Sequence, residues 1–182
     1  GVDERKPGSG GASVCVVGIA RPSGTTRSEI FRGVIRTPFK ENEMETPSYS
    51  PKVAAEMLGI NLKQLAGALK QRTYSPQDVV TLRGKFHKRP PQVGHRKQLF
   101  LNFKGGTGKT SLSTSYAWRL AEMGYGVLLI DLDSQGHATK CLGYEGEDFE
   151  KTLLNVLINR DPISEVIQRS ALPTLHFIPS NL

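Results

Sequence analysis

The sequence predicts an α/β fold in which a doubly wound parallel sheet follows a small helical domain. From residue 98 onward, short apolar runs alternate with helical patterns, the order that builds a parallel sheet covered on both faces. Between residues 47 and 86, apolar side chains recur at helical spacing, and Pro and Gly punctuate three short segments. These two sequence patterns indicate two structural units in one chain of 182 residues.

Composition narrows the class of partner. Basic residues outnumber acidic ones by 24 to 17, and the resulting net charge of +7 favours an anionic partner such as a nucleotide or nucleic acid, although ordinary solubility charge is an alternative explanation. Cys15 and Cys141 stand far apart and outside any C-x-x-C pair, so they indicate reduced thiols of a cytoplasmic protein rather than a disulfide framework or a zinc site. No apolar run is long enough to cross a bilayer, so we expect no membrane partner.

Residues 1–46 are expected to be a linker or disordered. Gly, Pro and Ser dominate residues 6–13 and 21–26, and hydrophobic residues make up only 37% of the chain, which suggests that part of it is not packed. A short apolar patch at residues 14–19 is compatible with one strand.

Residues 47–86 read as a helix-turn-helix module. Ser50 with Pro51 starts a helix that Gly59 ends, Asn61 caps a second helix that reaches about Lys70, and Ser75 with Pro76 starts a third over residues 77–85. The inward side chains are predicted to be Val53, Ala54, Met57 and Leu58, then Leu62, Leu65, Ala66 and Leu69, then Val79, Val80 and Leu82.

Residues 87–97 form a predicted linker between the two units. The stretch 83–97 is rich in Lys and Arg, carries Pro90-Pro91 and contains no acidic residue. Either it is a solvated spacer or it helps to hold a polyanion such as DNA.

The α/β unit is expected to cover residues 98–182. A buried strand at 99–102 leads into a glycine loop, and a helix at 110–123 leads to a second strand at 127–131. Helices are predicted at 149–159 and 162–169 and a last strand at 175–178. Leu112, Tyr116, Ala117 and Leu120 are expected to face inward from the first helix.

Residues 104–110, K-G-G-T-G-K-T, form a predicted phosphate-binding loop. Glycines let backbone N–H groups approach an anion, Lys109 supplies charge to the β- and γ-phosphates, and Thr110 supplies a hydroxyl for Mg²⁺. The usual G-x-x-x-x-G-K-[ST] pattern fails at Phe103, but the deviant form with a leading Lys104 fits. The predicted nucleotide contacts are Lys104, Gly105, Gly106, Thr107, Gly108, Lys109, Thr110 and Ser111.

Residues 102–110 and 127–139 (V-L-L-I-D-L-D-S-Q-G-H-A-T) resemble the ParA family of partition ATPases, which belongs with the MinD-like deviant-Walker NTPases. Residues 152–157 and 175–181 are similar as well, so the resemblance covers about 98–182. It implies a P-loop ATPase that binds ATP and Mg²⁺, forms a homodimer, binds DNA at the nucleoid, responds to a centromere-binding ParB-like partner, and partitions a plasmid or chromosome.

The resemblance also implies residue roles. Lys109 would be the phosphate-loop lysine, and Lys104 the signature lysine that reaches the phosphates of the partner protomer. Thr110 would ligate Mg²⁺, and Asp131 would lie near the metal shell. Asp133 would orient the attacking water and is also a candidate metal residue, unless these aspartates are a helix cap or a solvated strand end.

Three departures from the family pattern affect the interpretation. Thr107 and Ser134 replace the family's valine and proline, which are mild changes. The family's next motif, a strand that ends in Asp before a Pro-Pro pair, would follow Asn181. The chain is therefore expected to be either a fragment of a longer protein, which we favour, or an unusual truncation. By itself it should have an incomplete sheet and weak or no hydrolysis.

Residues 50–60 and 73–83 resemble a MerR-type winged helix-turn-helix. The resemblance implies that the second helix enters the major groove and that Lys63, Gln64 and Lys70 are its DNA-contact candidates. The segment that would form a wing is nearly absent, and a helical packing or dimerisation module is the alternative.

Three functions stay open at this stage. The first is a ParA-like partition ATPase, and the second is a related ATPase that positions another cargo. The third is a transcriptional regulator that binds an operator and uses nucleotide as a switch. A nitrogenase-iron-protein-like reductase is disfavoured because Cys141 stands alone after the second strand.

Overall fold

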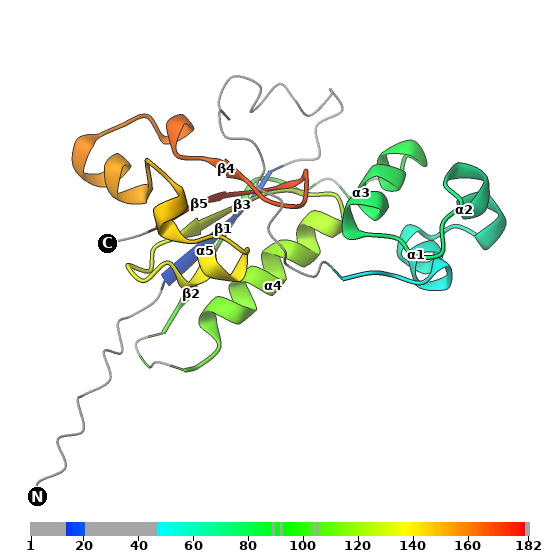
Figure 1. The fold of residues 1–182 in the computed structure, drawn as a ribbon, viewed down its shortest axis with the longest axis horizontal. Coiled ribbons are helices and arrows are strands. Elements are labelled where there is room, and N and C mark those ends of the chain that lie inside the picture. Colours follow the sequence, from blue (N-terminus) through cyan, green and yellow to red (C-terminus); the bar gives the residue numbers. More distant parts are fainter. Residues whose placement is uncertain are drawn as a thin grey trace, which may run out of the picture.

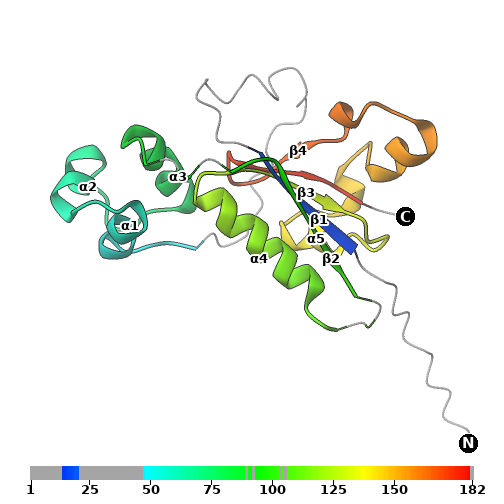
Figure 2. The same ribbon diagram turned by 180° about the vertical axis from the view of Figure 1, so that it is seen from behind.

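A five-stranded sheet with helices packed against it forms the body of the molecule, and three further helices form a module at one end (Figures 1 and 2). The computed structural model describes residues 14–20, 47–88, 90–91, 93–102, 104 and 106–180. The strand order is β2-β1-β3-β5-β4. The strands are β1 (Val14–Ala20), β2 (Arg96–Leu101), β3 (Gly126–Asp131), β4 (Gln168–Arg169) and β5 (Leu175–Ile178).

The α/β class is confirmed, but the sheet is mixed rather than wholly parallel. β3 and β5 run parallel, whereas β1 runs antiparallel to both of its neighbours, β2 and β3, and β4 runs antiparallel to β5. The strand considered possible at residues 14–19 of the expected linker is present: residues 14–20 form β1, an interior strand between β2 and β3. Cys15, Val17 and Ile19 alternate toward the core and are buried, which explains why this segment is a strand. The rest of residues 1–46 lies outside the described residues.

Helix α4 (Lys109–Glu122) packs on one face of the sheet, beside the short helix α5 (His137–Cys141). The predicted inward face of this helix was partly wrong: Ala117 is buried, but Leu112 is 61% exposed and Tyr116 is 37% exposed. Small side chains make the contact instead, namely Ser113, Thr114, Ala117 and Ala121. The hydroxyls of Ser113 and Thr114 donate to the Thr110 carbonyl at 2.9 and 2.8 Å, so these polar residues are buried without unsatisfied groups.

β2 is an edge strand, not the buried strand that the sequence predicted. Leu99 and Leu101 are 54% and 48% exposed because they lie on the outermost strand. The segment before β5 covers the face of the sheet opposite α4, next to β3 and β5. Leu153, Val166 and Ile167 pack there against Ile178.

The helices predicted at 149–159 and 162–169 are mostly absent. A helical turn with a π-helical part (Asn155–Asn159), a 3-10 turn (Ile163–Glu165) and β4 replace them. Arg160 adopts a left-handed conformation with φ of 59°, which ends the first turn, and Pro162 lacks the N–H that a continuing helix needs. The apolar spacing alone did not reveal these breaks.

The helical module matches its predicted elements closely. It consists of α1 (Pro51–Leu58), α2 (Leu62–Ala68) and α3 (Pro76–Lys85), and Gly59 ends α1 in the left-handed conformation at φ 62°. Its core comprises Ala54, Ala55, Leu58, Leu65, Tyr74, Val79 and Leu82. Val53, Leu62 and Ala66 were predicted to face inward but are exposed. Tyr74, which the prediction missed, is buried and donates to the Leu69 carbonyl at 2.5 Å.

The module packs directly on the C-terminal end of α4 (Figure 1). Val80 of α3 belongs to the main core. Arg83 donates through Nε to the Glu122 carbonyl at 2.9 Å and through Nη2 to the Met57 carbonyl at 2.5 Å. Tyr49 donates to the Glu122 carboxylate, which also pairs with Arg119 at 3.1 Å. One buried acidic residue therefore ties the module to the helix that follows the glycine loop.

The state of the two cysteines and the length and apolarity of the helices are the last features of the fold. Neither Cys15, which is buried, nor Cys141, which is exposed, forms a disulfide. Burial raises the pKa of Cys15 to about 11, which keeps this thiol protonated and unreactive. Within the described residues, none of the helices combines the length and apolarity that a membrane span requires.

Replacement of Glu122 by Ala should destabilise the fold by about 2 kcal/mol, because the half-buried Tyr49 hydroxyl loses its acceptor and Arg119 its partner. Urea unfolding measures this change. Glu56→Ala, on the exposed surface of α1, is the matched control and should change stability by less than about 0.5 kcal/mol. Equal stability of the two variants would contradict the role assigned to Glu122.

Candidate functional site

The glycine loop leads directly into the N-terminus of α4. Gly106 and Gly108 adopt φ of 69° and 77°, conformations that favour glycine, and Gly108 occupies the N-cap position. Its neighbours supply no side-chain cap, so the first N–H groups of a 14-residue helix remain available to an anion. Phe103 and Gly105 lie outside the described residues.

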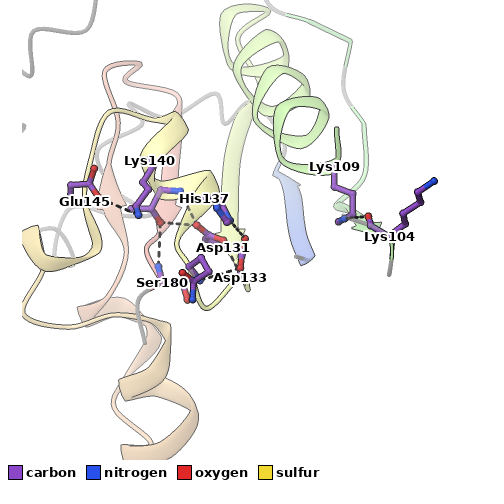
Figure 3. A network of polar contacts seen from close by, with 10 residues as sticks. Lys104, Lys109, Asp131, Asp133, His137, Lys140, Glu145 and Ser180 are labelled. Atoms are coloured by element: carbon purple, nitrogen blue, oxygen red, sulfur yellow. Dashed lines mark hydrogen bonds and ion pairs between the residues drawn. The ribbon is translucent and has the colours of Figure 1, made fainter. Parts of the chain in front are cut away.

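Lys109 folds back over this loop. Its Nζ donates to the Lys104 carbonyl at 2.9 Å (Figure 3). The Thr107 hydroxyl donates to the same carbonyl at 3.3 Å. The Lys104 backbone N–H donates to Asn102 Oδ1 at 3.0 Å, and the Lys104 side chain extends away from Lys109. The loop is thus shaped by its own side chains, with two ammonium groups near one helix end.

The residues of the loop fit a bound triphosphate. Two lysines, a helix N-terminus and left-handed glycines form a donor set that suits phosphate oxygens. Thr110 lies in the first turn and is half-buried, so its hydroxyl is available as an Mg²⁺ ligand, while Ser111 is exposed next to it. The predicted contacts that the structure describes therefore lie together.

Asp131 lies at the end of β3 and is 1% exposed. Its Oδ1 accepts from the Asp133 N–H at 3.1 Å, and its Oδ2 accepts from the N–H and hydroxyl of Thr139 at 2.8 and 2.9 Å. Burial raises the pKa of Asp131, and these hydrogen bonds oppose part of that rise. Asp131 thus anchors the turn after β3, a structural role that its prediction as a metal-shell residue did not include.

Asp133 is also buried, and both of its carboxylate oxygens are engaged. Oδ1 accepts from the Gln135 N–H at 3.1 Å, and Oδ2 contacts Nδ1 of His137. His137 was not among the predicted site residues. The signal in the sequence is the four-residue spacing of Asp133 and His137, which brings two side chains together when the intervening residues turn.

The site consists of two contact groups. Lys104 and Lys109 form one at the start of α4, and the two aspartates with His137 form the other after β3 (Figure 3). The second group continues to β5, because the Ser180 N–H donates to the Thr139 hydroxyl at 3.3 Å. No cluster of three or more His, Cys, Asp or Glu side chains able to hold a metal occurs among the described residues.

The DNA-contact candidates lie on and after α2. Lys63 and Lys70 are exposed. Gln64 is exposed too, but its Oε1 accepts from the Asn61 N–H at 3.0 Å while its own N–H donates to Asn61 Oδ1 at 2.8 Å. This capping box gives Gln64 a role in starting α2.

Residues 96–182 match the family model described as AAA domain. The chain is 66% identical over 139 residues to the cell division protein PomZ of Myxococcus xanthus, a match that covers 76% of this chain and 44% of PomZ. That match is longer than the stretch 96–182, so it takes in residues N-terminal of the AAA domain.

Two further relatives match a shorter part of the chain. The sporulation initiation inhibitor protein Soj of Bacillus subtilis is 37% identical over 81 residues, covering 44% of this chain and 32% of Soj. The chromosome partitioning protein ParA of Caulobacter vibrioides is 38% identical over 80 residues, covering 44% of this chain and 30% of that relative. No solved structure gives a significant match to the chain.

The chain spans less than half the length of these curated relatives. Within that span, the deviant phosphate loop at the start of α4 and the aspartate-bearing end of β3 occur in the order that the resemblance predicts. Over residues 96–182, the AAA-domain match and the relatives PomZ, Soj and ParA together support a similarity to the ParA/MinD-like partition ATPases.

Proposed function

We propose that this protein is a ParA-like ATPase that binds ATP with Mg²⁺, dimerises, binds DNA and positions a large cargo at the nucleoid. The loop at the start of α4 carries this proposal, since two lysines, left-handed glycines and an uncapped helix end lie in one place. Phosphoryl transfer depends on positioning and on charge neutralisation, which such a site provides.

Each residue of the loop has a distinct part. Lys109 would leave the Lys104 carbonyl to pair with the β- and γ-phosphates, and the first N–H groups of α4 would bind the phosphate oxygens. Thr110 would hold Mg²⁺, which neutralises phosphate charge when bound. Asp133 would orient water from the end of β3, while Asp131 keeps that turn in place.

The choice of cargo follows from the relatives. A relative with 66% identity bears the name cell division protein, whereas ParA, at 38%, is named for chromosome partitioning. The higher identity favours a cargo linked to cell division over plasmid or chromosome partition by a ParB-like partner. The basic module and the net charge of +7 support DNA as the track.

Lys109→Ala should abolish detectable ATP binding, a loss of about 100-fold or more, because the ammonium provides a charged hydrogen bond to the phosphates. Titration calorimetry with ATP and Mg²⁺ measures it. Lys97→Ala, on the exposed edge strand β2, should bind like the parent chain. Micromolar affinity retained by Lys109→Ala would refute the phosphate-loop assignment.

Lys104→Ala in the full-length protein should spare ATP binding but lose ATP-dependent dimerisation, because the exposed Lys104 side chain extends away from its own loop. Light scattering with and without ATP reports the dimer fraction, and Lys97→Ala serves again as the control. A dimer fraction that Lys104→Ala leaves unchanged would exclude the role between protomers.

Lys63→Ala with Lys70→Ala should weaken DNA binding and lower the salt dependence of the affinity by about two in log–log slope, one per lost phosphate contact. Fluorescence anisotropy with ATP, with ADP and without nucleotide measures it, with Lys140→Ala as a control on α5. Gln64 is left unchanged because it caps α2. Operator-specific binding without nucleotide would favour the regulator function instead, and binding unaffected by the double substitution would exclude α2 as the DNA-contact helix.

A further inference from the structure

The carboxylate of Asp133 is held from two sides by its own turn. The Gln135 N–H donates to Oδ1 at 3.1 Å, and the His137 ring contacts Oδ2 through Nδ1. An ionised carboxylate can only accept, so the hydrogen of this contact belongs to the imidazole Nδ1. Each carboxylate oxygen keeps a second lone-pair direction, and Asp133 can therefore still accept from a water molecule while it is held.

The backbone conformation of the turn before His137 is fixed by packing and by a hydrogen bond. Gly136, at φ 62°, precedes His137, and a Cβ there would approach the Ser180 carbonyl oxygen to 2.6 Å, so only glycine fits. The Gly136 N–H donates to the Asp133 carbonyl at 2.9 Å. These constraints fix where α5 begins and therefore where its first residue, His137, projects.

The other side of the turn is anchored to the sheet. Thr139 donates twice to the buried Asp131 carboxylate, and its hydroxyl accepts from the Ser180 N–H at the end of β5. The His137 side chain is 58% exposed, but the backbone that carries it is tied to both β3 and β5 (Figure 3). A surface histidine without such support would cover many rotamers.

We propose that His137 is a positioning residue that sets the orientation of the Asp133 carboxylate for water activation. The proposal rests on the proposed ATPase function of this site and adds a residue to it. Through Nδ1–H, His137 holds Oδ2, and the Gln135 N–H holds Oδ1, so the plane of the carboxylate is determined. Without His137, the Asp133 carboxylate keeps its hydrogen bond from the Gln135 N–H but gains freedom to rotate about χ2.

The test measures the hydrogen bond between His137 and Asp133 separately from its effect on ATP hydrolysis. Asn places an amide nitrogen near the position of Nδ1, whereas Gln places it near Nε2, so His137→Asn should restore what His137→Ala and His137→Gln lose. His95→Asn, an exposed histidine before β2, is the matched control. Two readouts apply to the full-length protein: ¹⁵N–¹H correlation spectra of the histidine rings, and the split between kcat and KM of ATP hydrolysis.

In its neutral form, His137 should show the Nδ1–H tautomer, and Asp133→Asn should shift it toward Nε2–H. The kcat of ATP hydrolysis should fall about 10-fold in His137→Ala and in His137→Gln, which is the size typical of losing a hydrogen bond that orients a catalytic group. KM and ATP affinity should stay unchanged, and His137→Asn should restore kcat.

A His137 ring spectrum that Asp133→Asn leaves unchanged would overturn the proposal, as would equal kcat in His137→Ala and the parent chain. A chain that binds no ATP would count against the proposed function instead, and the ring spectra would then decide the His137 contact.

Discussion

The close packing of α4 on the sheet is the constraint on which the rest of the structure depends. Small residues on one side of α4 let it approach β1 and β3, with Ala117 and Ala121 fully buried. Ser113 and Thr114 join that face because their hydroxyls bond within the helix. A bulky stripe would have held the helix farther from the sheet, and the glycine loop would have moved with it.

Because α4 is held along its length, its two ends can serve different purposes. The N-terminal end faces the loop with Lys109 and the left-handed glycines. The C-terminal end carries Glu122, which receives Tyr49, Arg119 and, through its carbonyl, Arg83. The helical module is therefore in direct contact with the helix that follows the glycine loop. This contact connects the module proposed to bind DNA with the helix proposed to bind ATP.

The neighbouring carboxylates of Asp131 and Asp133 have different roles. Both carboxylate oxygens of Asp131 accept hydrogen bonds from within the protein, from Thr139 and from the Asp133 backbone, and so stabilise the turn. Asp133 is held by one backbone N–H and one imidazole, which leaves it capacity for a further donor. Buried carboxylates two residues apart can thus differ in role because their hydrogen-bond partners differ.

The sequence by itself determined the local features. Caps at Ser50, Asn61 and Ser75, the stop at Gly59 and the glycine-lysine loop are read from adjacent residues, and all appear as predicted because local hydrogen bonds and backbone conformations decide them. Only the tertiary structure decided what depends on distant partners. It placed residues 14–20 at the centre of the sheet, left Leu99 and Leu101 on an open edge, turned the small face of α4 inward, and joined Glu122 to Tyr49 and Asp133 to His137. Strand pairing and burial are set by which segments meet in space, and spacing along the chain does not contain that information.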